Sequence, residues 1–284
     1  MAPMPELPEV ETMRRGLAEA VGSRIVDAGR LPCACKPIDI QPAVGVFRRR
    51  VQGARIADLS RAGKRVVLWL DTQDAIVVEP RMTGLLLVAD PPTRAHLRLR
   101  LRLADGPLAE ILYWDRRGLG NVRLFSKSEF LARFGPQTLG PDALEITAEL
   151  YRRQLGRSRR EIKPALLDQR AVAGIGNLYA SEILHVAGIH PRRRCRLMTR
   201  RQWQSLSEAT RAVLQEAIRY EGSTLGDGTY RNALNQPGRY QNEHRVYNRA
   251  GQACPSCGQA EIVRIVQTQR STFFCPACQR KTGG

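Results

Sequence analysis

The chain has 284 residues, enough for about two domains, and 43% of them are hydrophobic, which permits a buried core and argues against wholesale disorder. Its 45 basic residues outnumber 27 acidic ones, giving a formal net charge of +18, and this balance favours a polyanionic partner, with nucleic acid ahead of an acidic membrane surface. No run approaches the roughly 18 apolar residues of a membrane span, and the N-terminus lacks the apolar stretch of a secretory signal, so we expect a soluble protein of the cytoplasm.

The first predicted element is a helix that begins close to Glu6. Apolar residues recur at three- to four-residue spacing over residues 7–17, and Gly22 follows the end of this pattern. Pro8 is compatible only with the first turn of a helix, which fixes the start. Taken alone, Glu6 and Glu9 are most simply carboxylates that complement the positive end of the helix dipole.

Residues 24–125 are predicted to form β-structure. The segments VVLWL and AIVVE are short apolar runs, and leucine alternates strictly with arginine in HLRLRLRL. This alternation places the leucines on one face of a strand and Arg98, Arg100 and Arg102 on the other. A turn at residues 104–107 leads to the return strand AEILYW, so we expect a two-sheet sandwich with one arginine-decorated face.

Beyond residue 127 the hydrophobic period becomes helical. The predicted helices lie in the segments SEFLARF, TAELYRRQL, REIKPALLDQ, NLYASEILHVAG and RRQWQSLSEATRAVLQEAIRY. Residues 222–243 then form a long stretch rich in glycine, asparagine and glutamine without a clear period. A loop of this length in a compact protein is often functional.

The cysteines near the C-terminus give the strongest local signal. Cys254-Pro-Ser-Cys257 and Cys275-Pro-Ala-Cys278 are two CxxC pairs with 17 residues between them, which predicts one structural Zn²⁺ held by four thiolates, ahead of a disulfide pair or an iron–sulfur site. The intervening IVRIVQTQRSTFF is predicted to be a β-hairpin, on which Arg270 could either contact a DNA phosphate or stay a solvated charge. Ordinary thiols are expected at the remaining cysteines, Cys33, Cys35 and Cys195.

These elements together predict an α+β protein with three parts. Residues 1–127 would form an N-terminal helix and a two-sheet β-sandwich, residues 128–243 a helical domain, and residues 244–284 a zinc-bound β-hairpin. The sequence contains no internal repeat.

Six segments of the sequence, in this order, carry a family resemblance. They are PELPEVE at residues 5–11, RAGK at 61–64, RMTG at 81–84, IKP at 162–164, GIGNLYASE at 174–182, and the two CxxC pairs. Over essentially the whole chain they resemble the bacterial formamidopyrimidine-DNA glycosylases, and PELPEVE and GIGNLYASE are the most specific of them. PELPE at the start resembles the branch that acts on oxidised purines more than its endonuclease VIII relatives.

The resemblance implies a monomeric base excision repair enzyme with glycosylase and abasic-site lyase activities. Its partner would be double-stranded DNA that contains formamidopyrimidine, 8-oxoguanine or an abasic site. Pro5 would attack the sugar C1′ atom of a flipped-out nucleotide and form a Schiff base, from which elimination cuts the strand. Glu6 would protonate the sugar ring oxygen, with Glu9 as a second carboxylate nearby. The family's active-site lysine matches Lys64, and Arg270 completes the catalytic set.

The resemblance also implies side chains that fill the gap left by the flipped base. Met82 matches one of them, Arg117 matches the arginine that reads the orphaned cytosine, and Leu119 stands where an aromatic wedge is usual. Without the resemblance, Met82 and Leu119 would be interpreted as core residues.

Residues 167–188 resemble the helix–two-turn–helix of the family. There, Gly176 and Asn177 would bind a phosphate at the start of a helix, with Asn177 also capping it; on spacing alone the motif is a turn and a cap. Lys163 matches a further functional lysine, although it could be a solvated helix residue. The remaining expected DNA-binding residue is His96.

Two regions depart from the family pattern. Glu79 and Pro80 precede Arg81, where the family commonly has histidine and leucine, so Glu79 is expected to repel a phosphate at that place. Residues 222–243 correspond to the region that covers the everted base, but their sequence diverges.

Pro5 is internal as the sequence is written, and its tertiary amide nitrogen cannot act as a nucleophile. We expect translation to start at Met4 and removal of Met4 to expose the Pro5 amine. If the residues before Pro5 are retained, the alternative is a non-catalytic protein that binds damaged DNA. A general zinc-ribbon protein that binds RNA or DNA is a third hypothesis, but it leaves PELPEVE unexplained.

Overall fold

The computed structural model describes residues 5–226 and 228–281 of the chain. Met4, at which translation is expected to start, lies outside the described residues. Within these residues, no helix combines the length and the apolar character that crossing a bilayer requires.

The chain divides into two compact units. One comprises Met1–Gly135 with Tyr220–Arg239, and the other comprises Pro136–Arg219 with Tyr240–Gly284. Residues 220–239, which the sequence analysis assigns to the helical part, are thus grouped with the first unit. The expected three-part division of the chain stays a prediction.

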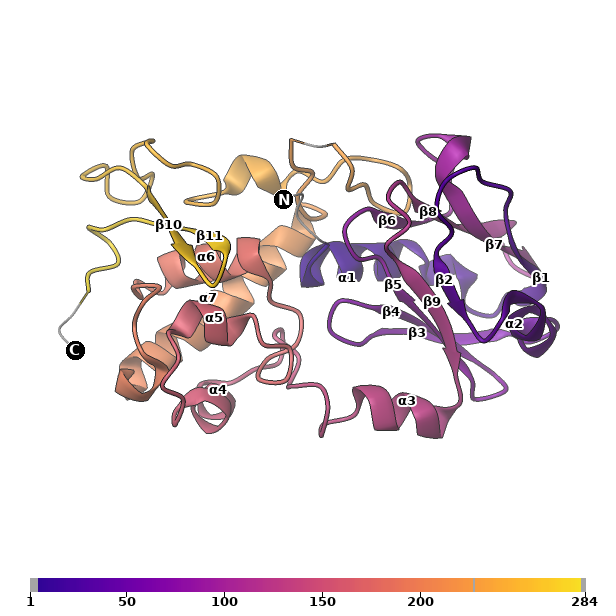
Figure 1. Ribbon diagram of the computed structural model, residues 1–284, viewed down its shortest axis with the longest axis horizontal. Helices are drawn as coiled ribbons and strands as arrows, with labels where there is room; N and C mark the ends of the chain where they lie inside the picture. The colour runs from indigo at the N-terminus through magenta and orange to yellow at the C-terminus, as the bar shows by residue number, and fades with distance from the viewer. Residues whose placement is uncertain (1–4, 227, 282–284) are drawn as a thin grey trace. The chain divides into compact units, whose positions relative to one another are not determined.

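In the first unit, the described residues form two sheets and three α-helices, which Figure 1 labels. One sheet is antiparallel throughout, in the order β1 (Arg24–Arg30), β7 (Leu97–Ala104), β8 (Glu110–Asp115) and β6 (Gly84–Leu87). In the other sheet the order is β2 (Asp39–Gln41), β9 (Asn121–Phe125), β5 (Ala75–Glu79), β4 (Val66–Leu70) and β3 (Ile56–Arg61), with only β2 and β9 parallel. The helices are α1 (Leu7–Gly16), α2 (Val44–Val51) and α3 (Lys127–Phe134).

The core of the first unit joins both sheets to α1. Val10 and Met13 of α1 are fully buried in one apolar cluster with strand residues such as Leu68 and Leu101. Burying each such side chain stabilises the fold by about 1.5–3 kcal/mol. Glu6 is the N-cap residue of α1, so the expected start of this helix is confirmed.

Two features of the first unit differ from the sequence analysis. Helix α2 lies inside the region predicted to be β, and it forms because Phe47 and Val51, one turn apart, are both buried. The expected arginine-decorated face of β7 is wrong for Arg98, whose side chain is only 2% exposed. The register between β7 and β8 shifts between Leu97 and Leu99, and this irregularity coincides with the burial of Arg98.

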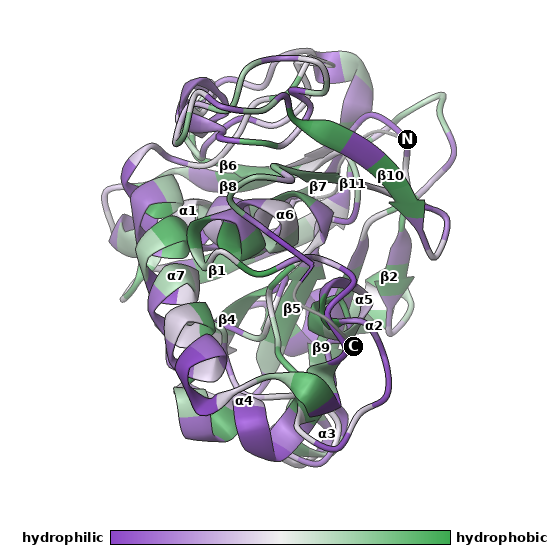
Figure 2. Cartoon of the chain, turned by 90° about the vertical axis from the view of Figure 1, so that its left-hand side faces the viewer, coloured by the Kyte–Doolittle hydropathy of each residue, from purple (hydrophilic) through white to green (hydrophobic). Residues whose placement is uncertain are grey.

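The second unit contains α4 (Ala148–Leu155), α5 (Ile162–Leu166), α6 (Asn177–Val186), α7 (Arg200–Arg219) and the hairpin of β10 (Val263–Gln267) and β11 (Arg270–Phe274). Helix α7 buries one apolar face, which includes Leu206, Val213 and Leu214, and Figure 2 shows the matching green and purple stripes along it. The predicted α+β class is confirmed, with an N-terminal helix, two multi-strand sheets, a set of helices and a terminal hairpin that carries four cysteines.

Candidate functional site

The N-terminus of α1 holds Pro5 and Glu6 in a buried position. The backbone N–H of Glu6 donates to Oε2 of Glu9 at 2.9 Å, and the backbone N–H of Ser223 donates to Oε1 of Glu9 at 2.9 Å. Both oxygens of the Glu9 carboxylate are therefore engaged by backbone groups. Glu9 fixes the helix start that carries Glu6 and fastens residues 220–239 to it.

Residues 220–239 are held on the first unit by several further bonds. Nδ2 of Asn235 donates to the carbonyl of Asp90 at 2.9 Å, and the carbonyl of Ala233 accepts from the N–H of Val88 at 2.9 Å. Gly222 has φ +79°, and a Cβ atom there would lie 2.9 Å from Oε1 of Glu9. Only glycine allows this close approach without strain. The position of residues 220–239 beside the start of α1 therefore depends on glycine at residue 222.

The turn between β3 and β4 carries Lys64, whose side chain is half-buried. Arg61 in the same turn donates to the carbonyl of Gly63 at 2.8 Å, and its Nε lies 3.4 Å from Oε2 of Glu11. Glu11, only 6% exposed, also pairs with Arg14 and Arg15, both at 2.8 Å. Glu11, for which no role was expected, therefore ties the Lys64 turn to α1.

The pKa of Glu11 reflects this environment. Burial alone would raise its pKa, but hydrogen bonds from Arg14 and Arg15 and the charges of Arg14 and Arg61 lower the pKa to about 2. The side chain of Glu11 is therefore ionised at neutral pH, and its ion pairs with the arginines form between full charges.

A second turn, residues 115–120, is organised by the fully buried side chain of Asp115. Its carboxylate accepts from the hydroxyl of Thr83, from the N–H of Arg117 at 3.1 Å and from the N–H of Gly120 at 2.8 Å. The Thr83 hydroxyl oxygen also lies 3.0 Å from the Arg117 N–H. Asp115 thus pins the RMTG segment and the RRGLG segment together.

The side chains expected to fill the gap in DNA lie on these two joined segments. The Nη1 atom of Arg117 lies 3.2 Å from Sδ of Met82. Arg117 is exposed, Met82 is half-buried, and Leu119 is 38% exposed. The interpretation of Met82 and Leu119 as core residues is therefore wrong. Their contact with DNA stays a prediction.

Arg98 supports the same turn from inside the unit. Its Nε donates to the carbonyl of Asp115 at 2.8 Å, and its Nη1 lies 2.7 Å from Sγ of Cys33. His96, half-buried, lies edge-on to Trp114 with ring centroids 5.4 Å apart.

Glu79 lies at the end of β5 and is half-buried. Its Oε2 is 3.3 Å from Nε of Arg65, and its Oε1 is 3.4 Å from Nη1 of Arg81. Two arginines thus counter the negative charge that the sequence analysis expects to repel a phosphate.

In the second unit, Lys163 is only 1% exposed, so its interpretation as a solvated helix residue is wrong. Its Nζ donates to Oδ1 of Asn177 at 2.7 Å, to the carbonyl of Ser271 at 2.9 Å and to Oγ1 of Thr272 at 2.8 Å. Nδ2 of Asn177 also donates to the Ser271 carbonyl at 3.0 Å. One buried ammonium therefore joins α5 to the start of α6 and to β11.

The loop before α6 explains the glycines of the GIGN segment. Gly176 is the N-cap residue of α6, whereas Asn177 is the first helical residue, so the expected capping role of Asn177 is corrected. Gly174 has φ +106° and its N–H donates to Oε1 of Gln169 at 2.9 Å. Nε2 of Gln169 donates in turn to the carbonyl of Ile175 at 2.9 Å.

Arg270 follows directly after the tip of the β10–β11 hairpin. Gln267 pairs with Arg270, and the two residues between them, Thr268 and Gln269, have φ of +44° and +62°. Two positive φ values in a two-residue loop are typical of a type I′ turn. This tight turn presents the exposed Arg270 next to Ser271, whose carbonyl binds Lys163 and Asn177.

The four C-terminal cysteines form one cluster. Their Sγ atoms all lie within 4.8 Å of one another, with 3.8 Å between Cys254 and Cys278 and 3.7 Å between Cys257 and Cys275. Tetrahedral Zn²⁺ with Zn–S bonds of about 2.3 Å requires sulfur–sulfur distances of about 3.8 Å. All four are free thiols. The predicted four-cysteine zinc site therefore fits the structure and leaves no open position for catalysis.

Buried polar side chains fasten the zinc module to the helices. The carboxylate of Glu182, fully buried, accepts from the N–H groups of Arg245, Val246 and Tyr247 at 2.7–2.9 Å. Burial raises the pKa of Glu182, and these three backbone hydrogen bonds oppose the rise. The fully buried Gln279 donates to the carbonyl of Ile189 at 2.8 Å. Glu182 ends the GIGNLYASE segment, but no sequence pattern indicates these partners.

Three family models match the chain in order. They are the formamidopyrimidine-DNA glycosylase N-terminal domain at residues 4–122, the formamidopyrimidine-DNA glycosylase H2TH domain at residues 138–228, and the zinc finger found in FPG and IleRS at residues 251–280. The cysteine cluster lies within the last of these.

Relatives match over nearly the full length. The chain is similar to formamidopyrimidine-DNA glycosylase of Chloroflexus aurantiacus, with 39% identity over 278 residues that cover 97% of this chain and 98% of the relative. It is 35% identical to that of Lactococcus lactis subsp. cremoris, which covers 98% of this chain and 100% of the relative.

Solved structures give the same result. The Lactococcus lactis Fpg in complex with DNA that contains an abasic site superimposes with a TM-score of 0.84 at 33% identity, covering 97% of this chain and 100% of that chain. A complex of a variant of that protein with DNA that contains Fapy-dG gives a TM-score of 0.84 at 34% identity, with 98% and 100% coverage.

Proposed function

Because the chain belongs to the formamidopyrimidine-DNA glycosylase family, we propose that it excises oxidised purines from duplex DNA and then cuts the strand at the abasic site. Membership of this family makes it a DNA glycosylase of base excision repair. The observation that carries the finer proposal is the buried Pro5–Glu6 pair, held at the start of α1 by the backbone bonds of Glu9.

The proposed chemistry begins after the damaged nucleotide is flipped out of the duplex. The secondary amine of Pro5 forms a bond to C1′ while the bond from C1′ to the base nitrogen breaks, and the N–H proton of the amine passes to the leaving base. The carboxylic acid of Glu6 donates a proton to the sugar ring oxygen as the ring opens, which gives an iminium ion between Pro5 and C1′. This cation acidifies the C2′ hydrogen, and loss of that proton expels the 3′ phosphate.

The mechanism requires a free amine on Pro5, so we propose that the active protein begins at Pro5 after removal of Met4. The match of the family's N-terminal domain begins at residue 4 and supports this proposal. Mass spectrometry of the N-terminus of native, active protein tests it. A terminus at Met1 or Ala2 in fully active protein would contradict it.

DNA contacts are proposed for exposed or half-buried side chains that lie on segments held by a buried charge. In the first unit, Arg117 and Met82 would enter the base stack, with Leu119 beside them as the wedge. In the second unit, Arg270 and Asn177 would bind phosphates. Lys163 would act as a positioning residue for both, because its three hydrogen bonds go to protein oxygens.

The deciding experiment is borohydride trapping on a duplex that contains 8-oxoguanine. Protein that begins at Pro5 should form a covalent adduct that peptide mapping places on Pro5, and a matched protein that begins at Ala2 should form none. Glu6→Gln in the Pro5-terminated protein should slow base excision while duplex binding is kept.

The second candidate function is non-catalytic binding of damaged DNA, favoured by the internal position of Pro5 in the sequence as written. Tight lesion binding without any adduct, by protein that begins at Pro5, would establish this alternative and end the first proposal.

A further inference from the structure

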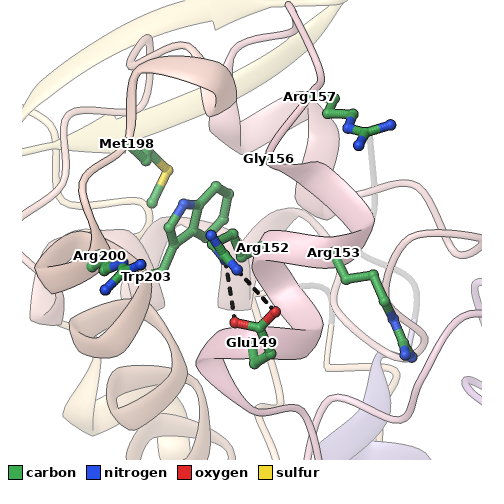
Figure 3. Close-up of a pocket in the computed structure, with 8 residues that line it drawn as sticks. All are labelled: Glu149, Arg152, Arg153, Gly156, Arg157, Met198, Arg200 and Trp203. Carbon is green, nitrogen blue, oxygen red and sulfur yellow. Dashed lines mark hydrogen bonds and ion pairs between the residues drawn. The ribbon is translucent and has the colours of Figure 1, made fainter.

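The arginine-rich pocket of the second unit offers no single binding site for an anion. This pocket, about 620 Å³ in volume, lies between α4 and α7, and the side chains of Arg153, Arg157 and Arg200 point away from one another around it (Figure 3). Its apolar lining residues, Trp203 and Met198, are only 3% and 9% exposed. Two thiols that the proposed function leaves unused lie instead in the first unit, in the loop between β1 and β2.

This loop, residues 31–38, presents both thiols to solvent. Cys33 is half-buried and Cys35 is exposed, and both are free. The remaining cysteine outside the zinc cluster, Cys195, is fully buried, and burial raises its pKa to about 11. Because a thiol reacts as its thiolate and must be accessible to its reagent, the expectation of an ordinary thiol fits Cys195 better than it fits Cys33 and Cys35.

Two hydrogen-bond donors converge on the sulfur of Cys33. Nη1 of Arg98 lies 2.7 Å from Sγ of Cys33, and the backbone N–H of Cys35 donates to the same sulfur at 3.4 Å. Arg98 is only 2% exposed, so water screens its charge little. A cation beside a sulfur stabilises the thiolate. When the Cys33 thiol, which donates to the Ala95 carbonyl at 2.9 Å, loses its proton, both donors to the sulfur are therefore already in place.

The second thiol lies beside a proton acceptor. The backbone bends at Ala34 and Cys35, and Sγ of Cys35 lies 3.7 Å from Nδ1 of His96. A neutral imidazole has one nitrogen that can accept a proton. One sulfur of the loop thus faces donors, and the other faces an acceptor. This arrangement is typical of a reactive thiol with a resolving partner.

We infer that Cys33 and Cys35 are a peroxide-reactive thiol pair that closes to a disulfide. The Cys33 thiolate bonds to one oxygen of hydrogen peroxide, the O–O bond breaks, and the leaving hydroxide takes up the proton that Cys33 released. Cys35 then passes its proton to Nδ1 of His96 while its sulfur bonds to the sulfur of the Cys33 sulfenic acid. The S–O bond breaks, and the leaving hydroxide takes that proton. The two thiols lose two electrons, and one hydrogen peroxide becomes two waters.

The disulfide would act on the turn of residues 115–120 through Arg98. Nε of Arg98 donates to the Asp115 carbonyl at 2.8 Å, and Nη2 of Arg98 lies 3.4 Å from the Arg116 carbonyl. The Cys33 sulfur and the turn therefore share one guanidinium group. Because a disulfide sulfur carries no negative charge, oxidation weakens one of the contacts that fix this group beneath the turn.

The loop also touches the turn directly. A Cβ atom at Gly118 would lie 2.4 Å from the carbonyl oxygen of Lys36, so the backbones of the two segments are in close contact. Formation of the disulfide changes the backbone of residues 33–35 next to this contact. Oxidation is therefore expected to loosen the turn that carries Arg117 and Leu119.

Peptide mapping by mass spectrometry tests the inference on zinc-loaded protein treated with equimolar hydrogen peroxide. The expected product is a Cys33–Cys35 disulfide, with Cys195 still a thiol. In Cys35→Ser the reaction should stop at the Cys33 sulfenic acid, which dimedone captures. In Cys33→Ser, capture at Cys35 should be at least about tenfold slower. Equal capture in the two variants, or oxidation of Cys195 as fast as that of Cys33, would overturn the inference.

The contribution of Arg98 is tested in the Cys35→Ser background. R98Q should slow dimedone capture at Cys33 at least about tenfold. The matched control is R102Q, which makes the same change of charge at an exposed position of the same strand and should leave the rate unchanged. Equal rates for R98Q and R102Q would overturn the role of the guanidinium group. If R98Q does not fold, capture in the two cysteine variants still decides the inference.

Amide hydrogen exchange tests the effect on the turn. Peptides that cover residues 115–120 should exchange at least about threefold faster in oxidised than in reduced protein. Cys33→Ser treated with the same peroxide is the matched control and should show no change. Unchanged exchange in the wild type, or an equal change in Cys33→Ser, would overturn the coupling between the thiol pair and the turn. Because these readouts involve no DNA, their failure is distinct from failure of the adduct experiment.

Discussion

The turn that carries Arg117 and the hairpin that carries Arg270 are both held by one buried ionisable side chain, but the two differ in sign. In the first unit the carboxylate of Asp115 gathers backbone N–H groups and a hydroxyl. In the second unit the ammonium of Lys163 gathers a carbonyl and two side-chain oxygens. Each exposed arginine therefore lies on a segment held by a buried side chain. The charge of that side chain suits the donors or acceptors that it binds.

The difference in sign determines which hydrogen-bonding groups lose their partner when Asp115 or Lys163 is substituted. Removal of Asp115 leaves donors without an acceptor, since the Thr83 hydroxyl and the Gly120 N–H lose theirs and the Arg117 N–H keeps only the Thr83 oxygen. Removal of Lys163 leaves oxygens, and the Ser271 carbonyl still accepts from Asn177. An unsatisfied buried group costs about 1–3 kcal/mol, so the first unit should depend on its buried charge more strongly than the second.

Asp115→Ala should therefore have the largest effect on stability. We expect a loss of about 4 kcal/mol in the free energy of unfolding, because the Thr83 hydroxyl and the Gly120 N–H lose their acceptor and the Arg117 N–H loses one of its two. Urea denaturation of the zinc-loaded protein measures this loss. Asp105→Asn is the control, since Asp105 pairs with Arg24 and Arg55 at the surface, where ion pairs contribute little, and asparagine tolerates its positive φ of 64°. Equal losses for the two variants would refute the role given to Asp115.

Acidification should destabilise the second unit before the first. Burial lowers the pKa of His244 from 6.5 to about 4, so between these values the unfolded chain binds a proton that the folded chain does not. Stability is then complete above about pH 6.5 and falls by about 3 kcal/mol as the pH approaches 4. Glu11 in the first unit has its pKa lowered from 4.5 to about 2, so its contribution is lost only below about pH 4.5.

The pH prediction is checked by urea unfolding at several pH values, for wild type and for His244→Phe. The variant should have a smaller slope between pH 6.5 and 4, because burial also lowers the pKa values of His185 and His190. The difference from wild type removes the contributions of these two histidines and of cysteine protonation, which both proteins share. Parallel curves for the two proteins would contradict the assignment to His244.

Lys163→Met should lower the free energy of unfolding by about 2 kcal/mol, measured by thermal denaturation, which is less than for Asp115→Ala. The substitution removes a donor and leaves acceptor oxygens, and one of these, the Ser271 carbonyl, still accepts from Asn177. Lys127→Met is the matched control, since Lys127 is exposed at the start of α3 and should change stability by less than about 0.5 kcal/mol. A cost for Lys163→Met as small as that of the control would show that its three contacts contribute little.

The smallest expected effect concerns DNA affinity rather than folding. Arg270→Gln should weaken binding to a duplex with a stable abasic-site analogue about tenfold and reduce the slope of log K against log salt by about one. Fluorescence anisotropy between 50 and 200 mM salt, roughly the range in which such contacts are resolved, measures both quantities. Arg211→Gln serves as the control for loss of one exposed charge, and an equal change in both variants would argue against a specific contact of Arg270.

The sequence predicted best those features that depend on neighbouring residues. The alternation in HLRLRLRL, the apolar runs VVLWL and AIVVE, and the CxxC spacing each predicted the element that the structure contains. Helix α2 was missed because its β-branched valines favour a strand locally, whereas burial of Phe47 and Val51 selects the helix.

The positioning residues could not be predicted, because their partners are remote in the sequence. Lys163 meets Thr272 across 109 positions, and Thr83 meets Asp115 across 32. Arg98 was expected on the exposed face from its place in the alternation, and only the structure places it under the 115–120 turn. Family motifs identified Lys163 as important, but its role as a buried donor follows from the contacts alone.

The assignment of Tyr220–Arg239 to the first unit has a practical consequence for dissecting this protein. A fragment cut after Gly135 would omit Ser223 and Tyr230, and Oε1 of Glu9 would lose its Ser223 donor. Truncation therefore removes a hydrogen bond that supports the start of α1, and an inactive N-terminal fragment would not test the role proposed for Pro5. Isolation of the first unit therefore requires that residues 220–239 stay with residues 1–135, and circular permutation can join these two segments.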